Sequence, residues 1–227
     1  DSSGIAAPGG RLRICPAQMA LYVRSGKCHR KLCERGGMCM KKEALRKTNE
    51  TEIEVSLEFL GKERKVEIGC GFLAHMVLMF SRTGIGICLK AKGDTEVDFH
   101  HLTEDIGIVL GQMLREIAKK GGIARYGWCI LPMDGSLARV ALDFSGRGDS
   151  YFSGSFPSEK CGDFDMELIP EFFRGFAREG GITLHIALLE TDNSHHAAEA
   201  VFKAVGMALW QALSPSDRAP STKGLWL

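Results

Sequence analysis

The residues best suited to chemistry occur in two copies of one motif, His-His-x-x-Glu. The first copy is His100–Glu104 and the second is His195–Glu199. Residues i and i+4 lie on one face of a helix, so the first His and the Glu of each copy could bind a common ion. The adjacent His points about 100° away and would face a second ion or a second chain. The motifs therefore predict a pair of transition-metal sites.

The ligand types narrow the kind of metal site. Imidazole with carboxylate suits Zn, Mn, Fe, Co or Ni, and neither motif contains a cysteine. A mixed nitrogen and oxygen site is more typical of catalysis than of a closed structural zinc. His75 and His185 could each supply a further imidazole. A lone histidine is usually structural, but two copies of the same arrangement favour a catalytic metal centre.

Each motif begins the last helix of one half of the chain. Apolar residues at helical spacing predict helices over residues 72–80, 101–118, 169–179 and 195–213. Alternating or apolar runs predict strands over residues 52–59, 64–68, 85–90, 95–99, 139–144, 150–156 and 182–189. The recurrence predicts an α+β fold of two duplicated half-domains, each a mixed four-stranded sheet with helices packed on one face, in the order strand–strand–helix–strand–strand–helix.

Composition argues against several classes of partner. The 227 residues include 29 Lys and Arg against 28 Asp and Glu, so no global charge favours nucleic acid. No apolar run reaches the roughly 18 residues of a membrane span. Of the eight cysteines, four lie in the first 39 residues and the other four are widely scattered, which favours a reduced, cytoplasmic protein over a disulfide framework.

Residues 1–39 differ from the rest because they are rich in Gly and basic residues and poor in acids. They could be an organelle-targeting segment, which would place the protein in a plastid. They could also form a zinc knuckle from Cys15, Cys28, His29, Cys33 and Cys39. The preferred interpretation is a disordered or mistranslated extension before Met40, with the functional domain at residues 40–227.

A second group of polar residues has the chemistry needed to bind an anion. Guanidinium, ammonium and hydroxyl groups suit phosphate oxygens, and these residues lie in polar or glycine-flanked surroundings. They are Arg125, Arg147, Lys203, Ser221, Thr222 and Lys223. Each alone is a weak signal, because a surface cation is usually only solvated.

In sequence order, several segments together resemble the imidazoleglycerol-phosphate dehydratase family of histidine biosynthesis. The segments are Asp98–Asp105, Pro132–Asp134, Ser145–Arg147, Asn193–Ala204 and Ser221–Gly224. The resemblance implies a lyase that dehydrates imidazole glycerol phosphate to imidazole acetol phosphate. It also implies a 24-subunit homo-oligomer, with two Mn²⁺ ions per active site held between neighbouring subunits. The duplicated halves would cover about residues 46–122 and 123–213, followed by a substrate-binding tail.

The resemblance also assigns roles to individual residues. One ion would take His75, His101, His196 and Glu199, and the other would take His100, Glu104, His185 and His195. The phosphate would be bound by the six anion-binding candidates. Glu50 matches the family's substrate-binding glutamate and is expected to transfer the proton during dehydration, which makes Glu50, Glu104 and Glu199 the expected catalytic carboxylates.

The chain departs from the family pattern at a few positions, which leaves two alternatives open. Ala74 stands where the family usually has Asp, Thr83 lies near a usual His, and Gly135 replaces an acidic residue. One alternative is a dinuclear metal hydrolase that acts on a phosphorylated small molecule. The other is a non-catalytic, metal-dependent assembly protein of the same fold.

Overall fold

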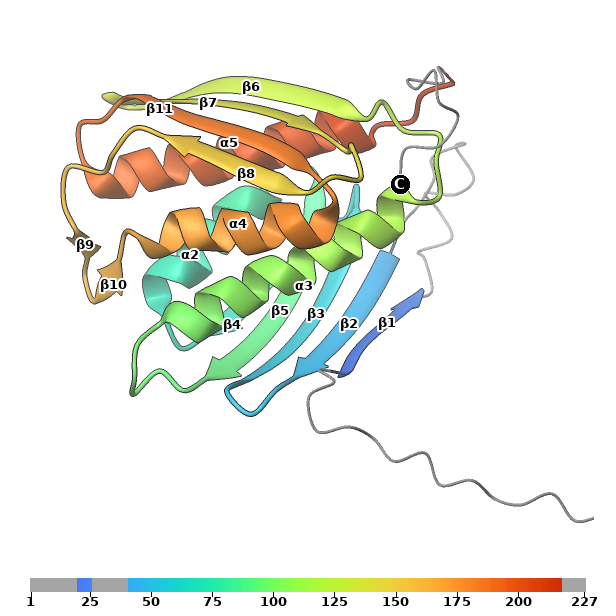
Figure 1. The fold of residues 1–227 in the computed structure, drawn as a ribbon, viewed down its shortest axis with the longest axis horizontal. Coiled ribbons are helices and arrows are strands. Elements are labelled where there is room, and N and C mark those ends of the chain that lie inside the picture. Colours follow the sequence, from blue (N-terminus) through green and yellow to red (C-terminus); the bar gives the residue numbers. More distant parts are fainter. Residues whose placement is uncertain (1–19, 26–40, 218–227) are drawn as a thin grey trace, which may run out of the picture.

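The computed structural model describes residues 20–25 and 41–217, in which two sheets enclose a layer of helices (Figure 1). The first sheet has the order β1-β2-β3-β5-β4, and its strands are β1 (Ala20–Ser25), β2 (Lys41–Lys47), β3 (Thr51–Phe59), β4 (Arg64–Ile68) and β5 (Ile85–Gly93). The second has the order β6-β7-β11-β8, and its strands are β6 (Tyr126–Met133), β7 (Ser136–Asp143), β8 (Asp149–Ser153) and β11 (Thr183–Glu190). A small hairpin pairs β9 (Lys160–Cys161) with β10 (Phe164–Asp165).

The two halves repeat one topology. β2-β3-β5-β4 pair in the sense antiparallel, antiparallel, parallel, and β6-β7-β11-β8 pair in the same sense. In each half, one helix precedes the last strand and one follows it. These helices are α2 (Gly71–Ser81), α3 (His100–Ala118), α4 (Leu168–Gly180) and α5 (Ser194–Leu213). The predicted α+β fold of two half-domains, each with a mixed four-stranded sheet, is confirmed, and β1 adds a fifth strand to the first sheet.

The order of elements within each half was predicted incorrectly. The observed order is strand–strand–strand–helix–strand–helix, with the β9-β10 hairpin added before α4 in the second half. The prediction differs because it omits β2 and β6. Thr95–Phe99, predicted as a strand, forms a turn in which the Val97 backbone N–H donates to the Asp94 carbonyl at 2.9 Å. No neighbouring strand pairs with this segment in the described structure, and β5 already ends at Gly93.

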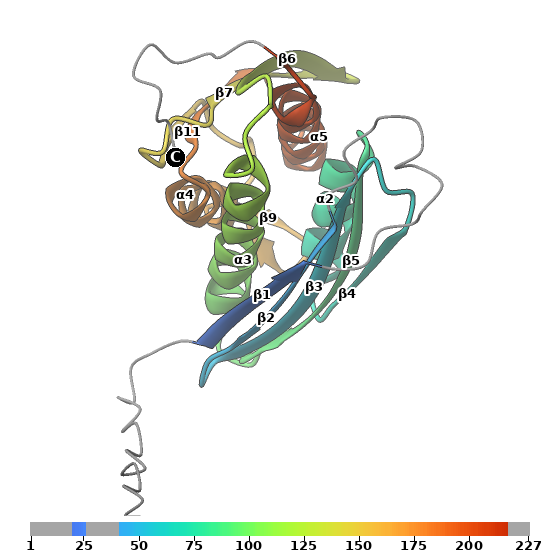
Figure 2. The ribbon, with the colours of Figure 1, turned by 90° about the vertical axis from the view of Figure 1, so that its right-hand side faces the viewer.

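The helices pack between the sheets (Figure 2). α2 covers β4 and β5, α3 contacts β2 and β3, α5 covers β6 and β7, and α4 covers β8. α2 packs on α5, and α3 packs on α4, as expected if a two-fold repeat relates the halves. The α3–α4 contact is very close, since a Cβ added at Gly107 would lie 2.3 Å from the Phe172 carbonyl oxygen.

The core between the layers is apolar and aromatic. Phe172, Phe173, Phe176 and Phe202 are fully buried, and their rings lie 4.8–6.3 Å apart in tilted, edge-to-face and stacked pairs. Burial of such rings is a large favourable contribution to folding. The core therefore holds α4 and α5 rigidly, and α5 carries the second His-His-x-x-Glu motif.

One buried ion pair ties the first sheet to α3. The Arg46 Nη2 of β2 lies 2.6 Å from Asp105 Oδ1, and the Thr51 hydroxyl donates to Asp105 Oδ2 at 2.5 Å. Arg46 is 3% exposed, so its charge is compensated within the core. This contact fixes the first turns of α3, where the first His-His-x-x-Glu motif lies.

Within the N-terminal segment, the structure describes one strand, β1, and the interpretation of the segment as an extension stays a prediction. β1 pairs antiparallel with β2, with Ala20 opposite Lys47. The other residues of the segment, including Cys15, Cys28, His29, Cys33 and Cys39 of the predicted zinc knuckle, lie outside the described residues. Within the described ranges, no helix is both long and apolar enough to cross a membrane.

Candidate metal centre

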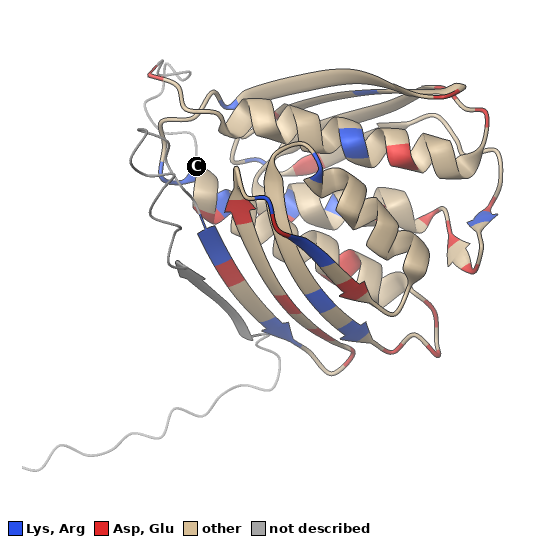
Figure 3. Ribbon diagram, turned by 180° about the vertical axis from the view of Figure 1, so that it is seen from behind, with Lys and Arg blue, Asp and Glu red and all other residues tan. Residues whose placement is uncertain are grey.

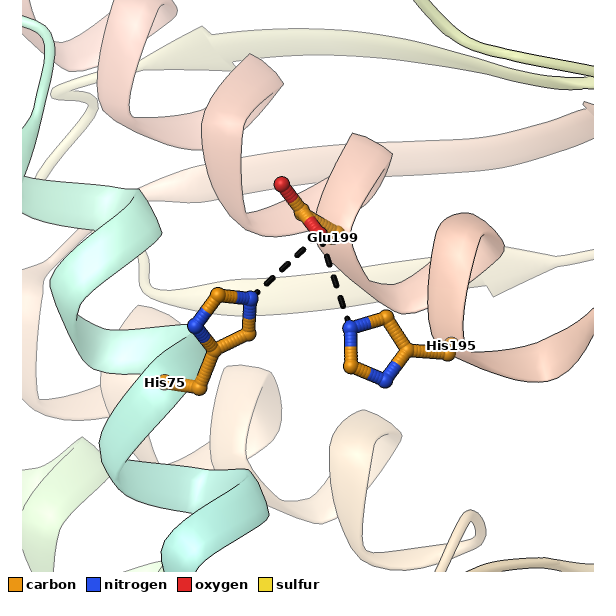
Figure 4. Close-up of side chains that lie close together, drawn as sticks. All are labelled: His75, His195 and Glu199. Carbon is orange, nitrogen blue, oxygen red and sulfur yellow. Dashed lines mark hydrogen bonds and ion pairs between the residues drawn. The ribbon is translucent and has the colours of Figure 1, made fainter.

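Three side chains from two helices converge at the N-terminal end of α5 (Figure 4). His75 comes from α2, and His195 and Glu199 come from α5. His75 Nε2 lies 3.4 Å from Glu199 Oε2, and His195 Nε2 lies 3.6 Å from the same oxygen. One ligand atom from each residue lies within 4.8 Å of the others. Two imidazole nitrogens and one carboxylate oxygen at this spacing fit a divalent transition metal.

Glu199 is held as an ion at the bottom of this cluster. Glu199 is 7% exposed, and its second carboxylate oxygen, Oε1, lies 2.6 Å from Lys203 Nζ one turn further along α5. Burial raises the pKa of the carboxyl, but hydrogen bonds from Lys203 and His75 outweigh burial and leave the pKa below its usual value. The carboxylate is therefore ionised at neutral pH, as a metal ligand must be.

The first motif has the arrangement that its spacing predicts. His100 Nε2 lies 3.8 Å from Glu104 Oε2 on the same helix face. The adjacent His101 points elsewhere, and the two imidazole planes are nearly perpendicular at 88°. The second motif behaves in the same way, with an angle of 84° between the rings of His195 and His196. In both copies, the two adjacent histidines therefore face different parts of the protein.

A carboxylate outside each motif contacts Nδ1 of the second histidine. Asp94 Oδ2 lies 2.9 Å from His101 Nδ1, and Asp192 Oδ2 lies 3.2 Å from His196 Nδ1. The bond to Asp94 raises the pKa of His101. Ligating histidines commonly donate the other ring N–H to a carboxylate, which fixes the tautomer and leaves Nε2 to bind the metal. Both histidines therefore have the surroundings of metal ligands.

Within the described residues, only His75, His195 and Glu199 of the predicted ligands form this cluster, and His185 lies apart from it. His185 is exposed on β11, where its ring stacks on Tyr151 with centroids 4.6 Å apart. Together with Arg139 these rings line a shallow pocket of about 200 Å³ on the outer face of the second sheet. The cluster of three joins His75 and Glu199, expected on one ion, with His195, expected on the other. The assignment of ligands to individual ions stays a prediction.

The predicted anion-binding residues have varied surroundings. Lys203 adjoins the cluster through Glu199. Arg125 is 8% exposed, and its guanidinium forms two bonds to Asp143 of 2.5 and 3.0 Å, which raise the pKa of Arg125. Arg147 is exposed, and its Nη1 lies 3.4 Å from the Ser145 carbonyl oxygen. Ser221, Thr222 and Lys223 lie outside the described residues.

Comparison with known proteins identifies the family. A family model described as imidazoleglycerol-phosphate dehydratase matches residues 68–209. The chain belongs to the imidazoleglycerol-phosphate dehydratase family. The dehydratase of Desulforamulus reducens is 48% identical over 187 residues, which cover 79% of this chain and 95% of that protein.

Two solved structures of imidazoleglycerol-phosphate dehydratases have the same fold. The Staphylococcus aureus enzyme superposes with a TM-score of 0.71 at 40% identity, covering 78% of this chain and all of that one. The Pyrococcus furiosus enzyme, solved in complex with (S)-C348, also superposes with a TM-score of 0.71. It is 37% identical, and the match covers 80% of this chain and 99% of that chain. The resemblance seen in the sequence is thus confirmed at the level of family and fold.

Sequence reasoning missed the residues that orient the histidines of this dehydratase-family site. Asp94 and Asp192 each lie in the loop before a motif, seven and four residues ahead of the histidine they contact. An acidic residue shortly before each His-His pair was a usable signal. Ser136, which donates a short hydrogen bond to Asp192, gave no such signal because it is 56 positions away.

The three departures from the dehydratase-family pattern leave the cluster intact. Ala74 is half-buried on α2 beside His75. The Thr83 hydroxyl donates to the Phe80 carbonyl at 3.4 Å and so serves the end of α2. Gly135 packs against Asp192, where an added Cβ would lie 2.8 Å from the Asp192 Cβ. The usual acidic residue at 135 would compete for this space.

Proposed function

We propose that this protein catalyses the dehydration of imidazole glycerol phosphate to imidazole acetol phosphate and water, a step of histidine biosynthesis. The observation that carries the proposal is the cluster of His75, His195 and Glu199 in a chain of the imidazoleglycerol-phosphate dehydratase family. We also propose a cytoplasmic location, to which the free thiols of Cys70, Cys88, Cys129 and Cys161 are suited.

The proposed reaction breaks two bonds of the glycerol chain. A C–H bond breaks on the central carbon, and the C–O bond breaks on the carbon attached to the ring. The proton and the departing hydroxide leave as water, and the enol that remains rearranges to the ketone. The central carbon is not acidic by itself, so the site must stabilise negative charge on the substrate and supply a group that moves the proton.

We propose that two Mn²⁺ ions occupy the site. One would be held by His75, His101, His196 and Glu199, and the other by His100, Glu104, His185 and His195. When bound, the ions supply Lewis-acid stabilisation of negative charge on the imidazole of the substrate. The carboxylates of Glu104 and Glu199 offset the cationic charge, while Asp94 and Asp192 hold two of the imidazoles in orientation.

Glu50 is proposed as the group that moves the proton. Its side chain is 54% exposed, and its Oε1 lies 4.0 Å from His101 Nε2. Its backbone carbonyl accepts a 3.1 Å bond from the Asp94 N–H, so the residue is anchored beside a histidine of the first motif. An exposed carboxylate next to a metal ligand can reach a bound substrate and exchange its proton with water.

The phosphate is proposed to bind Lys203 together with Arg125, Arg147, Ser221, Thr222 and Lys223. Lys203 is the best-supported member, because its ammonium lies at the cluster and is 26% exposed. It would contact the phosphate while it keeps its bond to Glu199. Arg147 has an exposed side chain and could contribute a second cation.

We further propose that copies of the chain assemble, with 24 subunits as the expected state. Charged residues are frequent along the strands of the first sheet and sparse along those of the second (Figure 3). The first carries Lys and Glu side chains, whereas the second exposes Trp128 at 66%, Ile130 at 62% and Tyr151 at 51%. Apolar surface of this kind marks a protein interface. His185 lies on the same face, so a second copy docked there could complete the ligand set.

An assay of the purified protein with imidazole glycerol phosphate tests the proposed function. The protein would be stripped of metal with a chelator, dialysed, and assayed with and without Mn²⁺. We expect a keto product only with the metal, and no inorganic phosphate. Release of inorganic phosphate would instead indicate the hydrolase, and binding of Mn²⁺ without any product would indicate the non-catalytic assembly protein.

A further inference from the structure

A short chain of hydrogen bonds links the buried start of β7 to His196. We propose that Ser136 and Asp192 are positioning residues that select the Nδ1–H tautomer of His196, and so leave Nε2 with its lone pair directed to a metal ion. The inference rests on the proposed function, because it takes His196 as a metal ligand.

The chain begins at a hydroxyl with a fixed orientation. Ser136 is 1% exposed, and its Oγ accepts the Asp192 backbone N–H at 3.2 Å. The hydroxyl hydrogen is then available to Asp192 Oδ1, to which it donates a short bond. The Asn193 backbone N–H donates to the same oxygen at 2.7 Å. Two donors therefore hold Oδ1, and the other oxygen, Oδ2, turns toward His196 Nδ1 at 3.2 Å.

A second group competes for the same ring nitrogen. The Asn193 Oδ1 accepts the His196 backbone N–H at 2.8 Å as the N-cap of α5, which fixes the orientation of the amide. Its Nδ2 then lies 2.8 Å from His196 Nδ1. An amide that donates to Nδ1 would favour the opposite tautomer, with the proton on Nε2 and no lone pair for a metal.

Two further features bear on the choice of tautomer. A hydrogen bond from a ring N–H to a carboxylate is stronger than one between neutral groups, so Asp192 outweighs Asn193. The exposed Asp134 carboxylate lies 3.5 Å from His196 Nε2 and by itself would favour a proton there. The hydrogen bonds from the Ser136 hydroxyl and the Asn193 backbone N–H oppose the effect of Asp134, because they keep Asp192 in place beside Nδ1.

Gly135 provides the space that this arrangement needs. An added Cβ at Gly135 would lie 2.8 Å from the Asp192 Cβ and 3.2 Å from its Oδ2. Gly135→Ala would therefore displace the carboxylate without removing any hydrogen-bonding group. The first half holds the corresponding histidine, His101, through Asp94, so an orienting carboxylate recurs in both copies of the motif.

The test compares Mn²⁺ affinity, measured by electron paramagnetic resonance of free Mn²⁺, among matched variants of the full chain. Asp192→Asn is expected to weaken binding by about 10- to 100-fold, the range found for residues that orient metal ligands. Ser136→Ala and Gly135→Ala should weaken it less. Asp165→Asn is the control. The side chain of Asp165 is 35% exposed, close to the 34% of Asp192, and it pairs only with Lys160 among the contacts described.

An exchange of the two side chains separates orientation from a general structural effect. In the double variant Asp192→Asn, Asn193→Asp, the carboxylate returns to the position 2.8 Å from Nδ1, and the N-cap acceptor is kept. Mn²⁺ affinity should recover to within a few-fold of the unmodified protein, which a merely structural role of Asp192 would not allow.

The outcomes separate this inference from the proposed function. Unchanged affinity in Asp192→Asn, or no recovery in a folded double variant, would overturn the inference even if the unmodified protein dehydrates its substrate. If the unmodified protein binds Mn²⁺ but forms no keto product, the proposed function fails. The loss and recovery of affinity would then still support the role of Asp192. Thermal unfolding identifies any variant that does not fold, and Gly135→Ala then takes the place of Asp192→Asn.

Discussion

At the scale of single residues, Glu199 combines the requirements of a metal ligand with those of a buried charge. Its two oxygens are divided between different partners, with Oε1 on Lys203 and Oε2 on the two imidazoles. A buried carboxylate is costly unless it is paired, and here Lys203 supplies the compensating charge. The residue can therefore stay ionised before a metal arrives and bind the metal without a change of protonation.

Glu199→Gln should abolish most metal binding while leaving the shape of the site. The amide is isosteric but neutral, so an ion would lose its charged oxygen ligand, and we expect Mn²⁺ affinity to fall by at least about 100-fold, more than the loss of an orienting residue. Isothermal titration calorimetry of the metal-free protein measures this directly. Lys203→Met is the comparison, because it removes the compensating charge but keeps the carboxylate ligand, and it should reduce Mn²⁺ affinity much less than Glu199→Gln. Equal losses in both variants would contradict the assignment of Glu199.

At the scale of elements, the sequence predicts the helices and most strands well, and the failures have physical causes. In β2, the inward positions are Lys42, Ala44 and Arg46, which are all buried. Two of the three are cations, so no apolar alternation marks the strand. The charge of Arg46 is compensated in the core by Asp105, which lies on a helix distant in sequence. No local sequence pattern could reveal this ion pair, because its two residues are 59 positions apart.

β6 was missed for the opposite reason. Its large side chains Tyr126, Trp128 and Ile130 point outward and are exposed, while its two buried inward positions hold the small residues Gly127 and Cys129. A Cβ added at Gly127 would lie 1.9 Å from the Ala208 carbonyl oxygen, so α5 packs directly on the strand backbone. The hydrophobic pattern is therefore inverted.

The candidate site was predictable to the extent that its residues share a helix. The spacing within each motif placed His100 beside Glu104 and His195 beside Glu199, as the structure has them. The approach of His75 depends on the packing of α2 on α5, so the sequence could name His75 only as a possible further imidazole, and the family resemblance assigned it to an ion. The place of Asp192 shortly before its motif was a usable signal, but its contact with Ser136 of β7 was not, because the two residues are 56 positions apart.

The close contact of α3 and α4 gives a prediction about stability. A Cβ at Gly111 would lie 2.3 Å from the Phe176 carbonyl oxygen and 2.9 Å from the Gly180 nitrogen. Gly111→Ala must push the helices apart, and overpacking of this kind costs about 1–3 kcal/mol. The free energy of unfolding, measured in denaturant, should fall by this amount. Gly71→Ala, where an added Cβ meets nothing within 4 Å, is the control and should be neutral or slightly stabilising.

At the scale of the whole molecule, duplication has produced two sheets with the same topology and different outer faces. The exposed positions of β2 and β3 include Glu43, Lys47, Glu52 and Glu54, whereas those of β6 are all aromatic or aliphatic. Both inner faces cover the same core, so folding does not explain the difference. The second sheet's outer face instead fits an interface between copies, which would also enclose the exposed His185.

Trp128→Ser should therefore disrupt the assembly without unfolding the chain. Trp128 is 66% exposed, so its loss removes little buried surface from a single copy but a large aromatic contact from an interface. Sedimentation velocity should show a shift from large particles to small ones, while thermal unfolding of the dissociated chain still shows a cooperative transition. Leu45→Ser is the control, because Leu45 is 46% exposed on the charged outer face of the first sheet and should not affect assembly. If Leu45→Ser dissociates the particles and Trp128→Ser does not, the interface lies on the first sheet instead.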